Sequence, residues 1–219
     1  MNRNAVSGIS YWLRNKLYLS LTNECSSISP IELRGPRFIM PEHSGFQLLS
    51  REPEAEDILH VVNTAYDDFS SVNRISVSSM ESDEITFAGF GEPLLRLDVL
   101  EKSSSLIKEF RHGAPLRLKT NGLVCSKDSM MIAERLKEAG IEKVSVNLLS
   151  DNPSQYMTIM KPKNSLSFGD VCSFVIACSS LEMDVTCTTV DRPDINAKAV
   201  RELALALGAH SFSIATYHP

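Results

Sequence analysis

The chain has 219 residues, which is enough for one sizeable hydrophobic core, so we expect a single domain over residues 1–219. Its composition, 43% hydrophobic and 22% charged residues, is that of an ordinary globular protein. The net charge of -5 argues against a nucleic-acid partner, and no apolar run approaches the roughly 20 residues that a membrane span needs. We therefore expect no nucleic acid and no membrane among its partners, and an intracellular, cytoplasmic location.

The N-terminal region combines a basic composition with a strand pattern. The first 23 residues contain Arg3, Arg14 and Lys16 and no acidic residue before Glu24, which leaves an organelle presequence open. However, leucines alternate with polar or aromatic residues over Leu17–Thr22, and this alternation predicts the first strand. Only residues 1–10 are then free to be disordered, which is short for a presequence.

Strand and helix patterns alternate along the rest of the chain. Short runs rich in Val, Ile, Leu and Thr predict five further strands, at Ile85–Ala88, Leu116–Lys119, Lys143–Leu148, Val185–Val190 and Ser211–Thr216. Helical patterns separate them, at Glu52–Ala65, Leu97–Phe110, Ser126–Ala139 with Ser126 as N-cap, Phe168–Ser179 and Ile195–Leu207. Six strands and about five helices in this order predict an α/β fold with a parallel sheet. The pattern alone leaves open whether the sheet is doubly wound or a partial barrel.

One connection is long. Residues 23–51 show no clear element, and a loop of this length usually carries function or is disordered. The loop leaves the C-terminal end of the first predicted strand, which is where parallel β/α domains build their sites.

Three polar motifs follow three successive predicted strands. Asn23-Glu24-Cys25 follows the first strand, Gly89-Phe90-Gly91-Glu92-Pro93 follows the second, and Thr120-Asn121-Gly122 follows the third. A glycine-rich turn is usually only a turn, and Glu92 before Pro93 is also typical of a helix N-terminus. Their shared order and their equivalent strand ends favour a single site at one edge of the sheet.

These motifs, taken together, resemble those of radical SAM enzymes, and the detail is most similar to the TatD-associated radical SAM proteins. The resemblance extends from about Tyr11 to Tyr217 and rests on the three motifs and on Tyr11–Leu19, Arg51–Pro53, Phe87–Asp98, Tyr156 with Lys161-Pro162, and Thr189–Pro193. It implies a partial (β/α)6 barrel of the radical SAM type.

The resemblance also implies a four-iron, four-sulfur cluster bound by a C-x3-C-x2-C motif in the first loop. Cys25 occupies the first cysteine position, but Ser29 and Glu32 occupy the other two. A hydroxyl and a carboxylate are poor substitutes for the soft thiolates that hold such clusters. We therefore expect the cluster to be absent, and we assign no catalytic residue.

The side of the site that would bind S-adenosyl-L-methionine (SAM) is better preserved. By resemblance, the cofactor-binding residues are Gly89, Phe90, Gly91, Glu92, Pro93, Thr120, Asn121, Gly122 and Asn147. Asn147 stands where the family has serine, and Leu149 where it has asparagine. Both departures weaken the contacts expected with the ribose of SAM.

Three functions follow from this pattern. The first is a pseudoenzyme that binds SAM or a related nucleotide, or that serves as an interaction subunit for a protein partner. The second is an active radical SAM enzyme with an atypical cluster, held by Cys25, Glu32 and a ligand from a partner. The third is a structural subunit of a larger assembly. The other cysteines, Cys125, Cys172, Cys178 and Cys187, are expected to be small core residues.

Overall fold

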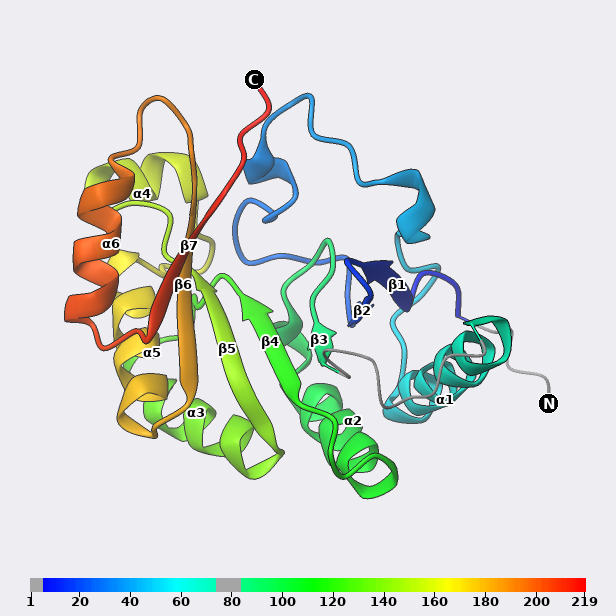
Figure 1. Ribbon diagram of the computed structural model, residues 1–219. Helices are drawn as coiled ribbons and strands as arrows, with labels where there is room; N and C mark the ends of the chain where they lie inside the picture. The colour runs from blue at the N-terminus through cyan, green and yellow to red at the C-terminus, as the bar shows by residue number, and fades with distance from the viewer. Residues whose placement is uncertain (1–5, 74–83) are drawn as a thin grey trace.

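The computed structural model describes residues 6–73 and 84–219 and has the expected α/β architecture. Its seven strands form one curled sheet in the order β1 to β7, with the helices on its outer side (Figure 1). The strands are β1 (Ser10–Leu13), β2 (Lys16–Leu19), β3 (Ile85–Phe87), β4 (Leu116–Thr120), β5 (Ile141–Asn147), β6 (Asp184–Val190) and β7 (Ser211–Ala215). The partial barrel is therefore confirmed.

The six expected strands are present as β2 to β7, but the expectation of a purely parallel sheet was wrong because the structure has an additional strand, β1. Strand β1 pairs with β2 in antiparallel fashion, and the other neighbours pair in parallel, so the sheet is mixed. The hairpin turns on Arg14 and Asn15, whose φ angles are 50° and 59°. A two-residue turn with both φ angles positive matches the twist of a hairpin, although glycine more often occupies such positions.

The described part of the chain contains six α-helices, where about five were expected. They are α1 (Ala55–Asn73), α2 (Leu97–Phe110), α3 (Ser129–Glu138), α4 (Pro153–Met160), α5 (Phe168–Ser180) and α6 (Ala197–Ala206). The additional helix is α4, which is capped by the Asn152 side chain and has Pro153 at its first position. Ser126 is not the N-cap of α3, because it starts a short 3-10 helix and its hydroxyl donates to Asp170.

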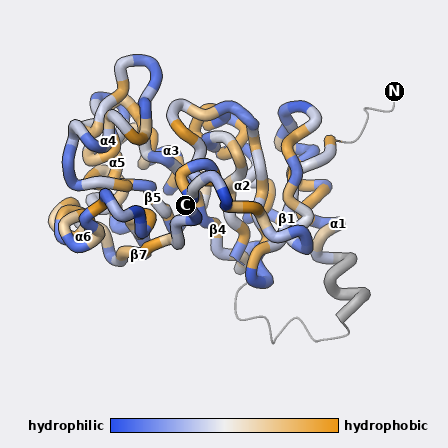
Figure 2. The backbone as a smooth tube through the Cα atoms, turned by 90° about the horizontal axis from the view of Figure 1, so that it is seen from above, coloured by the Kyte–Doolittle hydropathy of each residue, from blue (hydrophilic) through white to orange (hydrophobic). Residues whose placement is uncertain are grey.

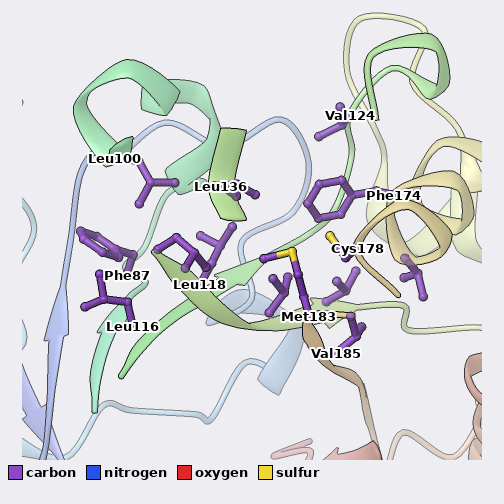
Figure 3. Close-up of a cluster of buried hydrophobic side chains, with 14 of the residues drawn as sticks. Phe87, Leu100, Leu116, Leu118, Val124, Leu136, Phe174, Cys178, Met183 and Val185 are labelled. Atoms are coloured by element: carbon purple, nitrogen blue, oxygen red, sulfur yellow. The ribbon is translucent and has the colours of Figure 1, made fainter. Parts of the chain in front are cut away.

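The core lies between the sheet and the surrounding helices. Alternate strand residues such as Phe87, Leu116 and Leu118 point outward and pack against helix residues such as Leu100 and Phe174 (Figure 3). These five side chains are fully buried. Burying side chains of this size contributes about 1.5–3 kcal/mol each, so these contacts hold the strands in register.

The cysteine expectation was correct for only part of the set. Cys178 and Cys187 are buried in the core, and Cys172 is half-buried. Cys125 is exposed, because it lies in the loop before the 3-10 helix Ser126–Asp128 rather than on a helix or strand that faces the core.

The parallel strands end at one edge of the sheet, which Figure 2 views from above. The loop from residue 23 to 51 starts at this edge and contains two short 3-10 helices, Glu32–Arg34 and Glu42–Ser44. The C-terminal tail returns to this loop, since the backbone N–H of His218 donates to Arg34 O at 2.7 Å. Of the segment expected to be disordered, residues 1–5 lie outside the described residues. None of the described helices is long and apolar enough to cross a membrane.

Candidate functional site

The loops that follow β2, β3 and β4 meet at the C-terminal edge of the sheet. The backbone N–H of Glu92 donates to Glu24 O at 2.8 Å, which joins the second loop to the first. The Glu92 carboxylate joins it to the third, because it accepts from Thr120 and Asn121. The three motifs identified in the sequence are therefore brought together.

The two glycines of Gly89-Phe90-Gly91 allow the loop after β3 to lie directly against the loop after β2. A Cβ atom on Gly89 would lie 2.6 Å from Ser20 Oγ, and one on Gly91 would lie 2.5 Å from Thr22 O. Both separations are too short for a real side chain. Gly91 is thus required by a close approach of backbone to backbone, whereas Gly89 makes room for the Ser20 side chain.

Glu92 is the most enclosed ionisable group of this edge, with 3% of its surface exposed. Oε1 accepts from Thr120 Oγ1 at 2.7 Å and from the backbone N–H of Leu94 at 3.0 Å, and Oε2 accepts from the N–H of Asn121 at 2.8 Å. Burial raises the pKa of Glu92, and these hydrogen bonds lower it in part. With Pro93 at the first position of the 3-10 helix Pro93–Arg96, Glu92 also acts as its N-cap.

Asn121 connects the third loop to the first. Its Nδ2 donates to Ser26 Oγ at 2.9 Å and Ser27 Oγ at 3.1 Å, and its Oδ1 accepts from the N–H of Leu123 at 2.9 Å. Gly122 adopts a φ of 68°, which lets the chain turn sharply at this point. Sequence reasoning did not anticipate the roles of Ser26 and Ser27, although two hydroxyls directly after Cys25 were a visible signal.

Asn147 is not part of this network. It is the last residue of β5 and is 9% exposed. Thr120 is in register with Val146, so Asn147 and Thr120 have opposite positions in the strand alternation and face opposite sides of the sheet. Among the described contacts, none joins the Asn147 side chain to the three loops.

Cys25 lies at the entrance of the network as a half-buried thiol. Its Sγ is 3.7 Å from Asn121 Nδ2 and 4.0 Å from Ser27 Oγ. Burial raises the pKa of Cys25, and the nearby charge of Glu92 acts in the same direction. This environment favours the neutral thiol, whereas metal binding uses the thiolate.

Ser29 and Glu32, at the other two cluster positions, bind to the protein itself. Ser29 is 1% exposed, and its Oγ donates to Phe90 O at 2.7 Å. The backbone N–H of Ser29 donates to Glu32 Oε2 at 2.9 Å. The pair therefore closes a turn that fixes the loop against the Gly-rich motif.

The residues present do not fit a four-iron, four-sulfur cluster. The three expected positions supply one thiol, one hydroxyl and one carboxylate, and the last two are already hydrogen-bonded. Among the described residues, no group of three or more His, Cys, Asp or Glu side chains is arranged to hold a metal ion.

The loop is also attached from its other side. The N–H of Ile28 donates to Met160 O at 2.9 Å, and that of Lys163 donates to Ser26 O at 2.8 Å. Lys163 Nζ reaches Cys25 O at 2.9 Å. Residues 25–29 are thus fixed to the loops after β3 and β4 and to the end of α4.

No protein-family profile matches the chain. Two curated relatives are described as probable GTP 3',8-cyclases: that of Methanocaldococcus jannaschii is 42% identical over 81 residues, and that of Methanococcus maripaludis is 37% identical over 90 residues. These matches cover 37% and 40% of this chain, and 23% and 28% of the relatives. The solved structure of Streptococcus suis SuiB bound to the precursor peptide SuiA has a TM-score of 0.64 and 12% identity, over 93% of this chain and 39% of SuiB.

Together these similarities support a relation between this chain and the radical SAM superfamily. SuiB has also been solved bound to S-adenosylmethionine, and that structure matches with a TM-score of 0.61 at 14% identity, over 94% of this chain and 42% of SuiB. At such identities the structural likeness establishes a shared fold. This chain spans about a quarter of the length of the curated relatives and about two fifths of SuiB, so the whole activity of those radical SAM relatives does not transfer with the fold.

Proposed function

We propose that the chain is a degenerate radical SAM protein, most similar to the TatD-associated group, that works by binding and not by radical chemistry. The observation that carries the proposal is the turn formed by Ser29 and Glu32. Both side chains are committed to bonds that stabilise the loop, and Cys25 alone cannot hold a cluster. A cytoplasmic location and a single domain over residues 1–219 are part of the same proposal.

SAM or a related nucleotide is the ligand that we propose for the C-terminal edge of the sheet. Without a cluster to chelate the amino and carboxylate groups of SAM, only hydrogen bonds near Gly91, Glu92 and Asn121 and packing of the adenine remain. Both oxygens of Glu92 already accept from the protein, so a bound amino group would have to share them. We therefore expect a dissociation constant no tighter than about 10 μM.

A protein partner is the second part of the proposal. In this form the same fold would serve as a structural or interaction subunit with no small ligand at the edge.

Anaerobic reconstitution with iron and sulfide, followed by titration calorimetry with SAM, tests the proposal. We expect no stoichiometric iron and a colourless protein with weak SAM binding. About four iron and four sulfide per chain, with cleavage of SAM on reduction, would establish the enzyme with atypical ligation and refute the pseudoenzyme. Colourless protein with no SAM binding would support the structural subunit.

A further inference from the structure

The inner face of the curled sheet is polar and basic, in contrast to the apolar outer face. Strand alternation places Tyr18, Thr86, Arg117 and Lys143 in one row across β2 to β5, because these residues are in register. Lys119 lies two positions further along β4 and therefore faces the same side. Tyr18, Thr86 and Lys119 are each the second-to-last residue of their strand, so this part of the inner face lies directly beside the loops described above.

Three cations meet at one buried carboxylate on this face. Glu84, directly before β3 and 3% exposed, accepts from Lys16 Nζ at 3.0 Å, from Lys143 Nζ at 3.0 Å and from Arg117 Nε at 3.1 Å. A single carboxylate balances one of these charges. The side chains of Lys16 and Lys143 are 36% and 32% exposed, so their ammonium groups reach solvent.

Lys119 adds a fourth cation that has no acidic partner among the described contacts. Its Nζ donates to the Tyr18 hydroxyl at 3.2 Å and lies 4.9 Å from the centre of the Tyr18 ring. Its register partner is Ser145, whose Oγ accepts from Arg117 Nη1 at 3.0 Å. Arg117 and Lys119 lie two residues apart on the same face. Arg117 is paired with Glu84 through Nε and Nη2, whereas the charge of Lys119 is balanced by no carboxylate among the described contacts.

Hydroxyl groups accompany the cations. The Thr86 hydroxyl is fully buried in the same row and has no hydrogen-bond partner among the described residues. Burying a hydroxyl without a hydrogen-bond partner costs free energy, because its bonds to water are lost and not replaced. Because Thr86 is fully enclosed, the neutral donors beside the cations are the hydroxyls of Tyr18 and Ser145, residues that are 9% and 7% exposed.

We propose that this inner face binds the phosphoryl group of a small metabolite, with Lys119 and Arg117 as its charged ligands. Four cations and one carboxylate leave an excess of three positive charges in a protein whose net charge is -5. Asp184, in register with Lys143 and exposed, reduces that excess by one. A phosphoryl dianion would balance the two positive charges that remain, and Arg, Lys and hydroxyl donors are the groups that bind phosphoryl oxygens.

The site adjoins the proposed SAM edge, but the proposal does not depend on SAM binding there. Lys119 is exposed and belongs to neither the Glu92 network nor the Glu84 cluster, so its substitution leaves both intact. Lys198 on α6 offers a matched control, because it is a lysine with an 87% exposed side chain on the outer side of the molecule.

Titration calorimetry with sodium pyrophosphate, at about 0.15 M ionic strength, tests the proposal. We expect saturable binding to the wild-type chain and a loss of affinity of about tenfold or more in Lys119→Ala, because a charge-assisted hydrogen bond is removed. Lys119→Arg, which keeps the charge, should retain affinity within about threefold, and Lys198→Ala should bind like the wild type.

The outcomes divide clearly. No saturable heat up to about 10 mM pyrophosphate overturns the site, as does an equal loss in Lys119→Ala and Lys198→Ala, which would reveal only a general charge effect. Malonate, tested in parallel, should bind more weakly, and equal or tighter binding of malonate overturns the assignment to a phosphoryl group. Lys119→Arg keeps the test valid if the alanine variant fails to fold.

Discussion

Restoring two thiols at positions 29 and 32 tests whether the chain is a decayed cluster protein. Ser29→Cys with Glu32→Cys recreates the C-x3-C-x2-C spacing behind Cys25. Ser29 is hydrogen-bonded to Phe90 O, and the loop is fixed to the ends of β3, β4 and α4. The new thiols should therefore lie close to the expected cluster position. We expect the double variant to take up iron and turn brown under anaerobic reconstitution.

The structure sets the stability cost of this change. Ser29→Cys weakens the buried bond to Phe90 O, which contributes about 0.5–1.5 kcal/mol. Glu32→Cys removes the carboxylate that accepts from the N–H of Ser29, a capping contact that contributes about 0.5–2 kcal/mol. The free energy of unfolding should therefore fall by about 1–3.5 kcal/mol, which a domain with a total of about 5–15 kcal/mol tolerates.

Urea unfolding of the metal-free variants measures this cost, and iron, sulfide and visible absorption measure the cluster. Each single variant has two of the three thiols and should bind little iron. A matched control, Ser27→Cys with Glu32→Cys, supplies three thiols at the wrong spacing and should stay colourless. Pro30 restricts the loop between the new ligands. If the double variant folds but binds no more iron than this control, the loop has left the ancestral geometry and the reasoning is refuted.

Two further predictions concern stability. Gly91→Ala should lower the free energy of unfolding by about 1–3 kcal/mol, because its Cβ would meet the carbonyls of Thr22 and Glu24. A Cβ on Gly113 would have no atom within 4 Å, so Gly113→Ala should change stability by less than about 0.5 kcal/mol in the same urea assay. Equal effects of the two substitutions would contradict the close approach at Gly91. Glu84→Gln should cost about 3 kcal/mol at pH 7, at the low end for a broken ion pair because Lys16 and Lys143 reach solvent. The cations lower the pKa of Glu84 to about 2 from 4.5, against the opposing effect of burial, so the wild type has this stabilisation above pH 4.5 and loses it as the pH falls toward 2. Melts across that range should converge for the two proteins, and parallel curves would show that folding does not shift the pKa of Glu84.

The sequence predicted the parallel part of the fold because its strands alternate and its helices carry clear apolar faces. It missed the β1–β2 hairpin, since Arg14 and Asn15 adopt positive φ angles without the glycine that usually marks such a turn. It also missed α4, although Asn152-Pro153 is a typical helix start, because a helix of eight residues gives little periodicity.

At the candidate site, the sequence predicted that three strand ends would meet, and they do. The bond between Ser29 and Glu32 was not predictable, because it depends on backbone angles in a loop without periodicity. The separation of Asn147 from Thr120 was predictable in principle. A one-residue offset between neighbouring parallel strands reverses the face of a side chain, so alternation and register together place the two side chains on opposite sides of the sheet.

Glu92 shows why a retained motif is weak evidence for a retained cofactor. In the family resemblance this carboxylate meets the amino group of SAM, yet here it accepts three hydrogen bonds from the protein and links the ends of β3 and β4. Removing it would leave Thr120 Oγ1 and the N–H of Asn121 and Leu94 without their acceptor in a buried place, which is costly whether or not SAM binds. The same holds for Gly91, which the backbone of the first loop requires. The requirements of folding alone therefore account for these two residues. Ser29 and Glu32 differ, because nothing in the fold demands thiols there, and they stand with Asn147 and Leu149 as positions at which this chain departs from the motifs that it resembles.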